Sequence, residues 1–203
     1  MSETTLRNIV FDIGWVLVHL APTWLLQMLR DHRAEADQLG QVTSRIDLHE
    51  QESGRIDGVG LVSNTVRLSP RGPSAELVAA AWIDMFDPDL RMFSLAERLR
   101  SRYRVSLLSN VGDLHWAELR RRFRLSKHGQ GVVTSFEAGA MKSYAEIYAQ
   151  TEKRFSLIPA ETVFIDDRLE NIEAVRVRGW QGIVHASHHE TVGALRALGV
   201  ETA

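Results

Sequence analysis

The feature that most constrains the fold of this chain is a series of short apolar segments, each of which ends in polar or small residues. Such segments occupy residues 9–11, 105–108, 132–133, 163–165 and 182–185. They are rich in valine and isoleucine and do not alternate with polar residues, which is typical of parallel strands covered on both faces. Stretches with apolar residues at helical spacing lie between them, as at Leu95 and Leu99. Strands that alternate with helices predict an α/β fold with a doubly wound, Rossmann-like parallel sheet.

The interval between the first and second of these segments is too long for one crossover helix. Residues 17–90 mostly favour helix and contain two apolar stripes at helical spacing, separated by the helix-breaking segment SPRGPS. A chain of 203 residues suits one domain that carries an insertion. We therefore expect an α/β core domain formed by residues 1–16 and 91–203, with an α-helical cap subdomain at residues 17–90.

Composition and charge indicate an ordinary globular protein. Apolar residues make up 44% of the chain and charged residues 25%, and the net charge of −2 favours neither nucleic acid nor a membrane as a partner. Arginine clusters at residues 98–104 and 120–124 are typical of solvated helix faces. The sequence leaves the oligomeric state open.

Cysteine usage and the N-terminus bear on location. The absence of cysteine excludes disulfides and thiolate metal sites, and it fits a reducing compartment. The first residues, MSETTLRN, are polar and unlike a signal peptide. No apolar stretch approaches the roughly 20 residues that a membrane helix needs. We therefore expect a cytoplasmic protein.

Polar side chains gather where the predicted strands end. In an open parallel sheet, ligands bind beyond the carboxyl ends of the strands. Any one of these side chains alone is common as a cap or turn former, but adjacent acids after an apolar strand repel each other unless a cation offsets them. The side chains expected at this edge are Asp12, Ser109, Asn110, Lys142, Asp166 and Asp167.

This set of residue types suits phosphoryl transfer to a carboxylate. Asp12 would attack phosphorus and form an aspartyl phosphate, which water then hydrolyses. A Mg²⁺ ion held by carboxylates offsets the repulsion between Asp12 and the phosphate. Lysine and hydroxyl groups hold the remaining phosphate oxygens while the charge redistributes. The pattern therefore predicts a magnesium-dependent phosphatase.

The same residues carry a resemblance to a known family. The segments VFDIGWVLV, LLSN, GAMKSYAEIY and VFIDDRLEN occur in this order, and the match extends from Ile9 to about His185. The chain resembles the haloacid dehalogenase (HAD) superfamily, and most of all its small phosphatase-type hydrolases with a helical cap inserted after the first strand. The resemblance implies hydrolysis of a small phosphate monoester, with a sugar phosphate as one candidate, and a cap that closes over the site and selects the substrate.

The resemblance also implies roles for individual residues. Asp12, Lys142 and Ser109 would be catalytic, with Asp12 as the nucleophile. Ser109, Asn110 and Lys142 would bind the phosphate. Magnesium would be held by Asp12, the main-chain carbonyl of Gly14, Asp167 and Asp166, with Asp167 favoured over Asp166 as a direct ligand.

The chain departs from the family pattern at Gly14. Most phosphatases of the superfamily have a second aspartate there, which protonates the leaving oxygen and contributes roughly 10²–10⁴-fold to the rate. Glycine keeps the metal-binding carbonyl and removes the proton donor. A branch with this D-x-G pattern includes sugar-phosphate phosphatases. The bulky Trp15 follows, and it would either wall the pocket or partly fill it.

Three hypotheses therefore remain open from the sequence. The first is a phosphatase that prefers esters whose leaving group needs little protonation. The second is a 2-haloacid dehalogenase, in which halide leaves without an acid but the acidic pair Asp166 and Asp167 has no purpose. The third is a non-catalytic HAD-like protein that binds a ligand or a partner. His19 and His115 are candidates for a replacement acid, although hinge and packing roles are the more common ones for such histidines.

Overall fold

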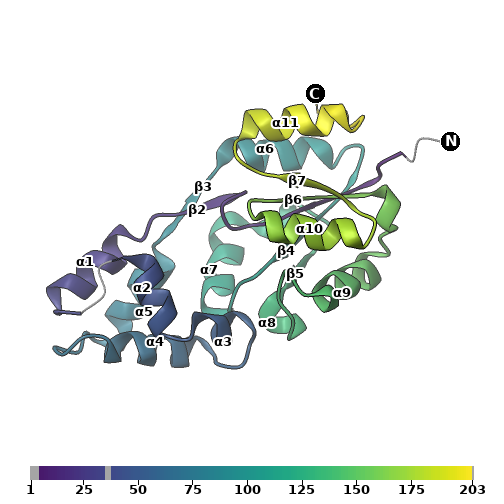
Figure 1. Ribbon diagram of the computed structural model, residues 1–203. Helices are drawn as coiled ribbons and strands as arrows, with labels where there is room; N and C mark the ends of the chain where they lie inside the picture. The colour runs from purple at the N-terminus through teal and green to yellow at the C-terminus, as the bar shows by residue number, and fades with distance from the viewer. Residues whose placement is uncertain (1–4, 35–37, 203) are drawn as a thin grey trace.

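The computed structural model describes residues 5–34 and 38–202, and its centre is a five-stranded parallel sheet with the strand order β5-β4-β1-β6-β7 (Figure 1). The strands are β1 (Asn8–Phe11), β4 (Arg104–Ser109), β5 (Val132–Thr134), β6 (Thr162–Asp166) and β7 (Gln181–Val184). Each of them contains one of the predicted apolar segments or overlaps it. The doubly wound α/β fold expected from the sequence is confirmed.

The register of the sheet brings three chemically important strand ends to one level. Phe11 of β1 lies opposite Leu107 of β4 and Ile165 of β6. The pairing continues one residue beyond β1, since the backbone N–H of Asp12 donates to the carbonyl of Ile165 at 2.9 Å. Residues that directly follow these strands therefore meet at the same edge of the sheet.

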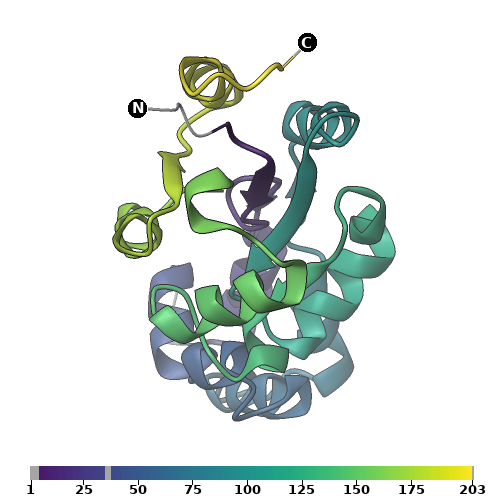
Figure 2. The ribbon, with the colours of Figure 1, turned by 90° about the vertical axis from the view of Figure 1, so that its right-hand side faces the viewer.

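Helices cover both faces of the sheet and explain why its strands are apolar throughout. Ile9 and Phe11 pack with α6 (Leu90–Leu99) and α11 (His188–Ala197), whereas Val10 packs with α9 (Ala145–Phe155) and α10 (Leu169–Val177) on the other face. Figure 2 shows α10 and α11 on either side of the yellow-green strand β7. The shorter connecting elements are α7 (Asp113–Phe123), η1 (Leu125–Lys127), α8 (Ser135–Ala138) and η2 (Pro159–Glu161).

The segment between β1 and α6 forms a separate group of helices beside the sheet (Figure 1). Its members are α1 (Thr23–Asp31), α2 (Leu39–Arg45), α3 (Leu48–Glu52), α4 (Gly58–Arg67) and α5 (Ala75–Ile83). The SPRGPS segment separates α4 from α5, as its composition predicts. We refer to these five helices as the cap. The predicted limits of the cap, residues 17–90, stay a prediction.

Two short strands connect the cap to the core, and the sequence did not predict them. β2 (Val18–Leu20) and β3 (Phe86–Pro88) pair in antiparallel fashion and carry the chain out to the cap and back. Three residues are too few to establish an alternating pattern, so this ribbon could not be distinguished from the flanking helical sequence. Within the described ranges, none of the helices is long and apolar enough to cross a lipid bilayer.

One end of the cap is held firmly against the core. The Ser135 hydroxyl donates to the carbonyl of Glu52 at 2.5 Å, and the amide of the buried Gln51 donates to the Asp113 carboxylate at 3.0 Å. These bonds link α3 to α8 and α7. The C-terminal end of α3 is therefore fixed relative to the sheet.

Close packing at Gly54, just after α3, provides a test of this attachment. Gly54 has φ +77°, and an added Cβ would lie 2.5 Å from the carbonyl oxygen of Phe136. Gly139 has a similar φ of +63°, but apart from Gly139 and its two chain neighbours no heavy atom of the described residues lies within 4 Å of its Cβ position. Gly139→Ala should lower the free energy of unfolding by about 1–2 kcal/mol through backbone strain alone. Gly54→Ala should cost a further ~1–3 kcal/mol through overlap with the core.

Urea denaturation of the two variants measures this difference. Gly139→Ala is the control for left-handed backbone strain, because it has the same backbone conformation in open space. Equal losses of stability in the two variants would contradict close packing of the cap on the core at Gly54.

Candidate active site

Lys142 is the centre of the charged cluster at the carboxyl edge of the sheet. Its Nζ lies 2.7 Å from Oδ1 of Asp12 and 2.7 Å from Oδ2 of Asp166, and all three side chains are buried. Burial by itself lowers the pKa of a lysine, but the two carboxylates outweigh it and raise the pKa of Lys142 above its ordinary value. Lys142 therefore carries its positive charge inside the site.

Asn110, which follows β4, positions the backbone of Lys142. The Asn110 side-chain amide donates to the Lys142 carbonyl at 3.0 Å and accepts from the Lys142 N–H at 2.9 Å. This two-way contact joins the end of β4 to the segment before α9. Its predicted role in phosphate binding stays a prediction, and the structure gives Asn110 a positioning role in addition.

Asp12 lies directly after β1 and is 6% exposed. Its Oδ1 accepts a hydrogen bond of 2.7 Å from the Ile13 N–H, as well as the contact with Lys142. Burial raises the pKa of Asp12 to about 7, Lys142 opposes this change, and the charge of Asp166 adds to it. A divalent cation beside Asp12 lowers the pKa again, because it favours the ionised carboxylate.

The two acids after β6 differ in how many hydrogen bonds their carboxylates already accept. Asp166 is fully buried and accepts hydrogen bonds from the Arg168 N–H at 2.9 Å, from Asn171 Nδ2 at 2.8 Å and from Lys142. Asp167 is half-buried and faces the cavity described below. Burial, and next the charge of Asp166, raise the pKa of Asp167.

These acids form a group that fits a magnesium ion. Oxygen atoms of Asp12, Asp166 and Asp167 lie within 4.8 Å of one another. Mg²⁺ prefers such carboxylate oxygens. Because the oxygens of Asp166 already accept three hydrogen bonds, the geometry favours Asp12 and Asp167 as direct ligands. The roles assigned to individual residues from the sequence stay predictions, but the structure brings these residues together.

A cavity of about 680 Å³ opens over the cluster. Trp15 lies at its rim in a left-handed backbone conformation (φ 57°), with 46% of its surface exposed, so it leaves the cavity open. Apart from Gly14 and its two chain neighbours, no heavy atom of the described chain lies within 4 Å of a Cβ placed on Gly14. The polar residues that line this cavity are Asp12, His49, Glu52, Ser109, Asn110, Lys142, Ser143, Tyr144, Asp167, Arg168 and Asn171.

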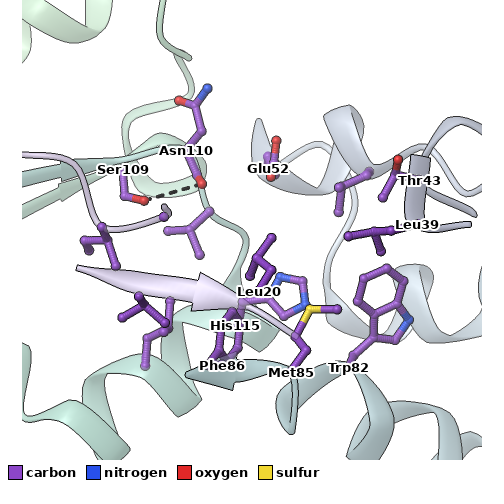
Figure 3. A pocket seen from close by; sticks show the side chains of 16 residues that line it. Leu20, Leu39, Thr43, Glu52, Trp82, Met85, Phe86, Ser109, Asn110 and His115 are labelled. Carbon is purple, nitrogen blue, oxygen red and sulfur yellow. Dashed lines mark hydrogen bonds between the residues drawn. The ribbon is translucent and has the colours of Figure 1, made fainter. Parts of the chain in front are cut away.

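A second, smaller cavity of about 120 Å³ lies between the cap and the core, and we call it the apolar chamber (Figure 3). Figure 3 shows side chains of the core, among them Ser109 and Asn110, across from Glu52, Thr43 and Leu39 of the cap. Its apolar lining consists of Ile13, Val18, Leu20, Leu39, Leu48, Trp82, Met85, Phe86, Val111 and Leu119, together with the ring of His115. The residues common to both cavities are Gly14, Leu20, Glu52, Ser109 and Asn110, so the two adjoin.

The two histidines considered as replacement acids do not suit that role. His115 is packed beside Trp82 and Phe86, with ring centroids 5.4 Å apart in each case, and burial lowers its pKa to about 4. It is therefore neutral near pH 7. His19 lies in β2 with Nε2 3.6 Å from Asp89, and it lines neither of the two cavities.

Glu52 is the site residue that sequence reasoning missed. It is the last residue of α3, it is partly buried, and it lines both cavities. Burial raises its pKa to about 7, against the opposing charges of Lys142 and Arg168. Its position depends on how the cap docks on the core, and no local spacing in the sequence reports that contact.

Comparisons with known proteins agree with this fold. No protein-family model matches the chain. The chain is 27% identical over 201 residues to Sesquiterpene phosphatase astK of Aspergillus oryzae. This alignment covers 96% of this chain and 97% of that protein. It is 29% identical over 185 residues to D-ribitol-5-phosphate phosphatase of Bacteroides thetaiotaomicron. This alignment covers 87% of this chain and 90% of that protein.

A solved structure extends the comparison to the fold. The magnesium complex of HAD family enzyme bt-2542 from Bacteroides thetaiotaomicron superimposes with a TM-score of 0.82 at 22% identity. The superposition covers 94% of this chain and 98% of that chain. The two proteins therefore share their fold along nearly their whole length.

Magnesium is expected to stabilise the folded protein, because the three carboxylates meet only when the sheet forms. At about 100 times its Kd, the ion should raise the free energy of unfolding by about 2.7 kcal/mol, as measured by urea denaturation. Asp167→Asn should lose most of this gain. Asp84→Asn, at the exposed C-cap of α5, should keep it. The same gain in both variants would place the ion elsewhere.

Proposed function

We propose that the chain is a hydrolase of the haloacid dehalogenase superfamily, a magnesium-dependent phosphatase that hydrolyses a small phosphate monoester through an aspartyl-phosphate intermediate. One observation carries the proposal: Lys142 joins the buried Asp12 to Asp166, beside Asp167, at the floor of an open cavity. The names of the two relatives, Sesquiterpene phosphatase and D-ribitol-5-phosphate phosphatase, support the same reaction.

In the proposed reaction, one carboxylate oxygen of Asp12 attacks phosphorus. The hydrogen bonds that Oδ1 accepts from Ile13 and Lys142 orient the Asp12 carboxylate for this attack. The alcohol departs, and water then cleaves the aspartyl phosphate and restores Asp12. Lys142 and Ser109 line the same cavity, where they hold phosphate oxygens as the charge redistributes.

The magnesium ligands in this proposal are Asp12, Asp167 and the main-chain carbonyl of Gly14. When bound there, the ion supplies positive charge that offsets the repulsion between the phosphate and the carboxylates. Asp166 keeps Lys142 in place through its 2.7 Å contact and holds the turn after β6 through Arg168 and Asn171.

Two other functions are less well supported. Dehalogenation of a 2-haloacid needs no metal, so it does not explain why the carboxylates of Asp12, Asp166 and Asp167 lie together. A purely ligand-binding role would fit a blocked or dismantled site. Here Trp15 leaves the cavity open, and Lys142 is in contact with Asp12.

The apolar chamber supports a finer statement about the substrate. Its volume of about 120 Å³ is close to that of a cavity which accommodates benzene, so it suits roughly five carbon atoms. Sugar hydroxyls would lose their hydration there, and apart from Glu52, Ser109 and Asn110 at the boundary with the first cavity, Thr43 and His115 are the polar side chains among the described residues that line the chamber. An apolar alcohol is therefore favoured over a sugar or polyol as the leaving group.

The activity is tested by phosphate release from a panel of phosphate esters. Turnover should require Mg²⁺, stop on addition of EDTA and fall by roughly a thousandfold or more in Asp12→Asn, since the nucleophile is lost. Circular dichroism of the variant controls for folding. Halide release from a 2-haloacid in the presence of EDTA would instead favour the dehalogenase.

The preference for an apolar alcohol is tested with alkyl phosphates from methyl to pentyl. Each added methylene that enters the chamber should raise kcat/KM by about fourfold, which corresponds to ~0.8 kcal/mol. Thr43→Phe, which places a ring in the chamber, should flatten this dependence. A polyol phosphate with a higher kcat/KM than pentyl phosphate would contradict the preference.

A further inference from the structure

The site lacks the usual proton donor for the departing alcohol. Gly14 has no side chain, and the space beside it is open. An aliphatic alkoxide is a poor leaving group unless it receives a proton as the P–O bond breaks. The titratable and charged groups that line the cavity are Asp12, His49, Glu52, Lys142, Tyr144, Asp167 and Arg168.

Most of these groups are unsuited to the role. Asp12 is the nucleophile, Asp167 is a metal ligand in the proposal above, and Lys142 is held between two carboxylates. His49 and Tyr144 are exposed and do not line the apolar chamber. We propose that Glu52, which the cap supplies, is the acid–base residue that replaces the missing carboxylate at position 14. This inference rests on the proposed phosphatase function.

The position of Glu52 between the two cavities supports this role. It lines the phosphate cavity on one side and the apolar chamber on the other, as do Ser109 and Asn110 from the core (Figure 3). An ester whose phosphate lies by Lys142 and whose alcohol lies in the chamber has its bridging oxygen at this boundary. A carboxyl group there is close to the atom that must be protonated.

The attachment of α3 to the core fixes this position. The Glu52 carbonyl accepts the Ser135 hydroxyl at 2.5 Å, and the preceding Gln51 bonds to Asp113 at 3.0 Å. Gly112 packs so closely that an added Cβ would lie 1.8 Å from the Gln51 side chain. The core therefore holds the backbone of Glu52 in place, although the residue belongs to the cap.

The surroundings of Glu52 favour a carboxyl group that exchanges protons near neutrality. Within residues 5–34 and 38–202, its carboxylate forms neither a hydrogen bond nor an ion pair, and burial raises its pKa to about 7. A bound phosphate dianion would raise it further. Glu50, on the same helix, differs because its hydrogen bonds with Arg55 lower its pKa.

The proton balance of the reaction then closes. In the first step, the Asp12 oxygen bonds to phosphorus, the bridging P–O bond breaks, and Glu52 gives its proton to the departing alkoxide. In the second step, Glu52 takes a proton from water, whose oxygen bonds to phosphorus. The acyl phosphate bond breaks, which restores the Asp12 carboxylate and releases inorganic phosphate. Glu52 ends the cycle protonated, as it began.

The test compares Glu52→Gln with the matched control Glu50→Gln on two esters in the presence of Mg²⁺. On pentyl phosphate, Glu52→Gln should lower kcat/KM by about 10²–10⁴-fold, because the alkoxide leaves unprotonated. On 4-nitrophenyl phosphate, whose phenolate needs no proton, kcat/KM should be retained. Glu50→Gln should resemble the unmodified protein on both esters.

Two further readouts separate proton transfer from a structural role. Glu52→Gln should release a burst of about one 4-nitrophenol per active site, because the phosphorylated Asp12 accumulates when water lacks a base. In the unmodified protein, kcat/KM for pentyl phosphate should fall as the pH rises through the pKa of Glu52, since the first step needs its proton. This limb should be absent in Glu52→Gln.

Equal losses of kcat/KM on both esters without a burst would overturn the role of Glu52. A pH profile that is the same in Glu52→Gln as in the unmodified protein would overturn it as well. If Glu52→Gln does not fold, Glu52→Asp gives the same test, since it should lower kcat and keep the pH limb. If the unmodified protein hydrolyses no ester, the proposed function itself is wrong. If it does, and Glu52→Gln matches it on pentyl phosphate, only this inference is wrong.

Discussion

The Lys142 ammonium between Asp12 and Asp166 is the interaction on which the rest of the site depends. It joins the ends of β1 and β6 to the segment before α9, which Asn110 in turn ties to β4. Three buried charges in contact are stable only as a complete set, and loss of one partner from such a buried pair typically costs about 3–5 kcal/mol. The strand register that aligns Phe11 with Leu107 and Ile165 therefore also sets the chemistry.

Much of the fold and of this cluster could be predicted from the sequence, because short local patterns of residues indicate both. Buried strands show as apolar runs, and in a parallel sheet their carboxyl ends must meet at one edge. That rule was sufficient to bring Asp12, Ser109, Asp166 and Asp167 together. Helical spacing likewise predicted α1 and α5 of the cap, and the SPRGPS segment predicted the break before α5.

The remaining features depend on contacts that are distant in sequence. The ribbon of β2 and β3 is too short to leave a pattern, and the apolar chamber exists only because cap residues such as Trp82 face core residues such as Leu119. Glu52 belongs to this group, since the bonds to Ser135 and Asp113 place it. The substitution at Gly14 showed that a donor was missing, but only the docked cap indicates what could replace it.

The central claim is that the phosphoryl group is transferred to Asp12 first and that water then hydrolyses the aspartyl phosphate. Acid quenching during turnover, followed by borohydride reduction and mass spectrometry of the peptides, tests it most directly. The account predicts that reduction of the acyl phosphate converts Asp12 to homoserine, only when ester and Mg²⁺ are both present. Unmodified Asp12 under conditions where the enzyme is shown to be turning over, or modification of a different carboxylate, would contradict it.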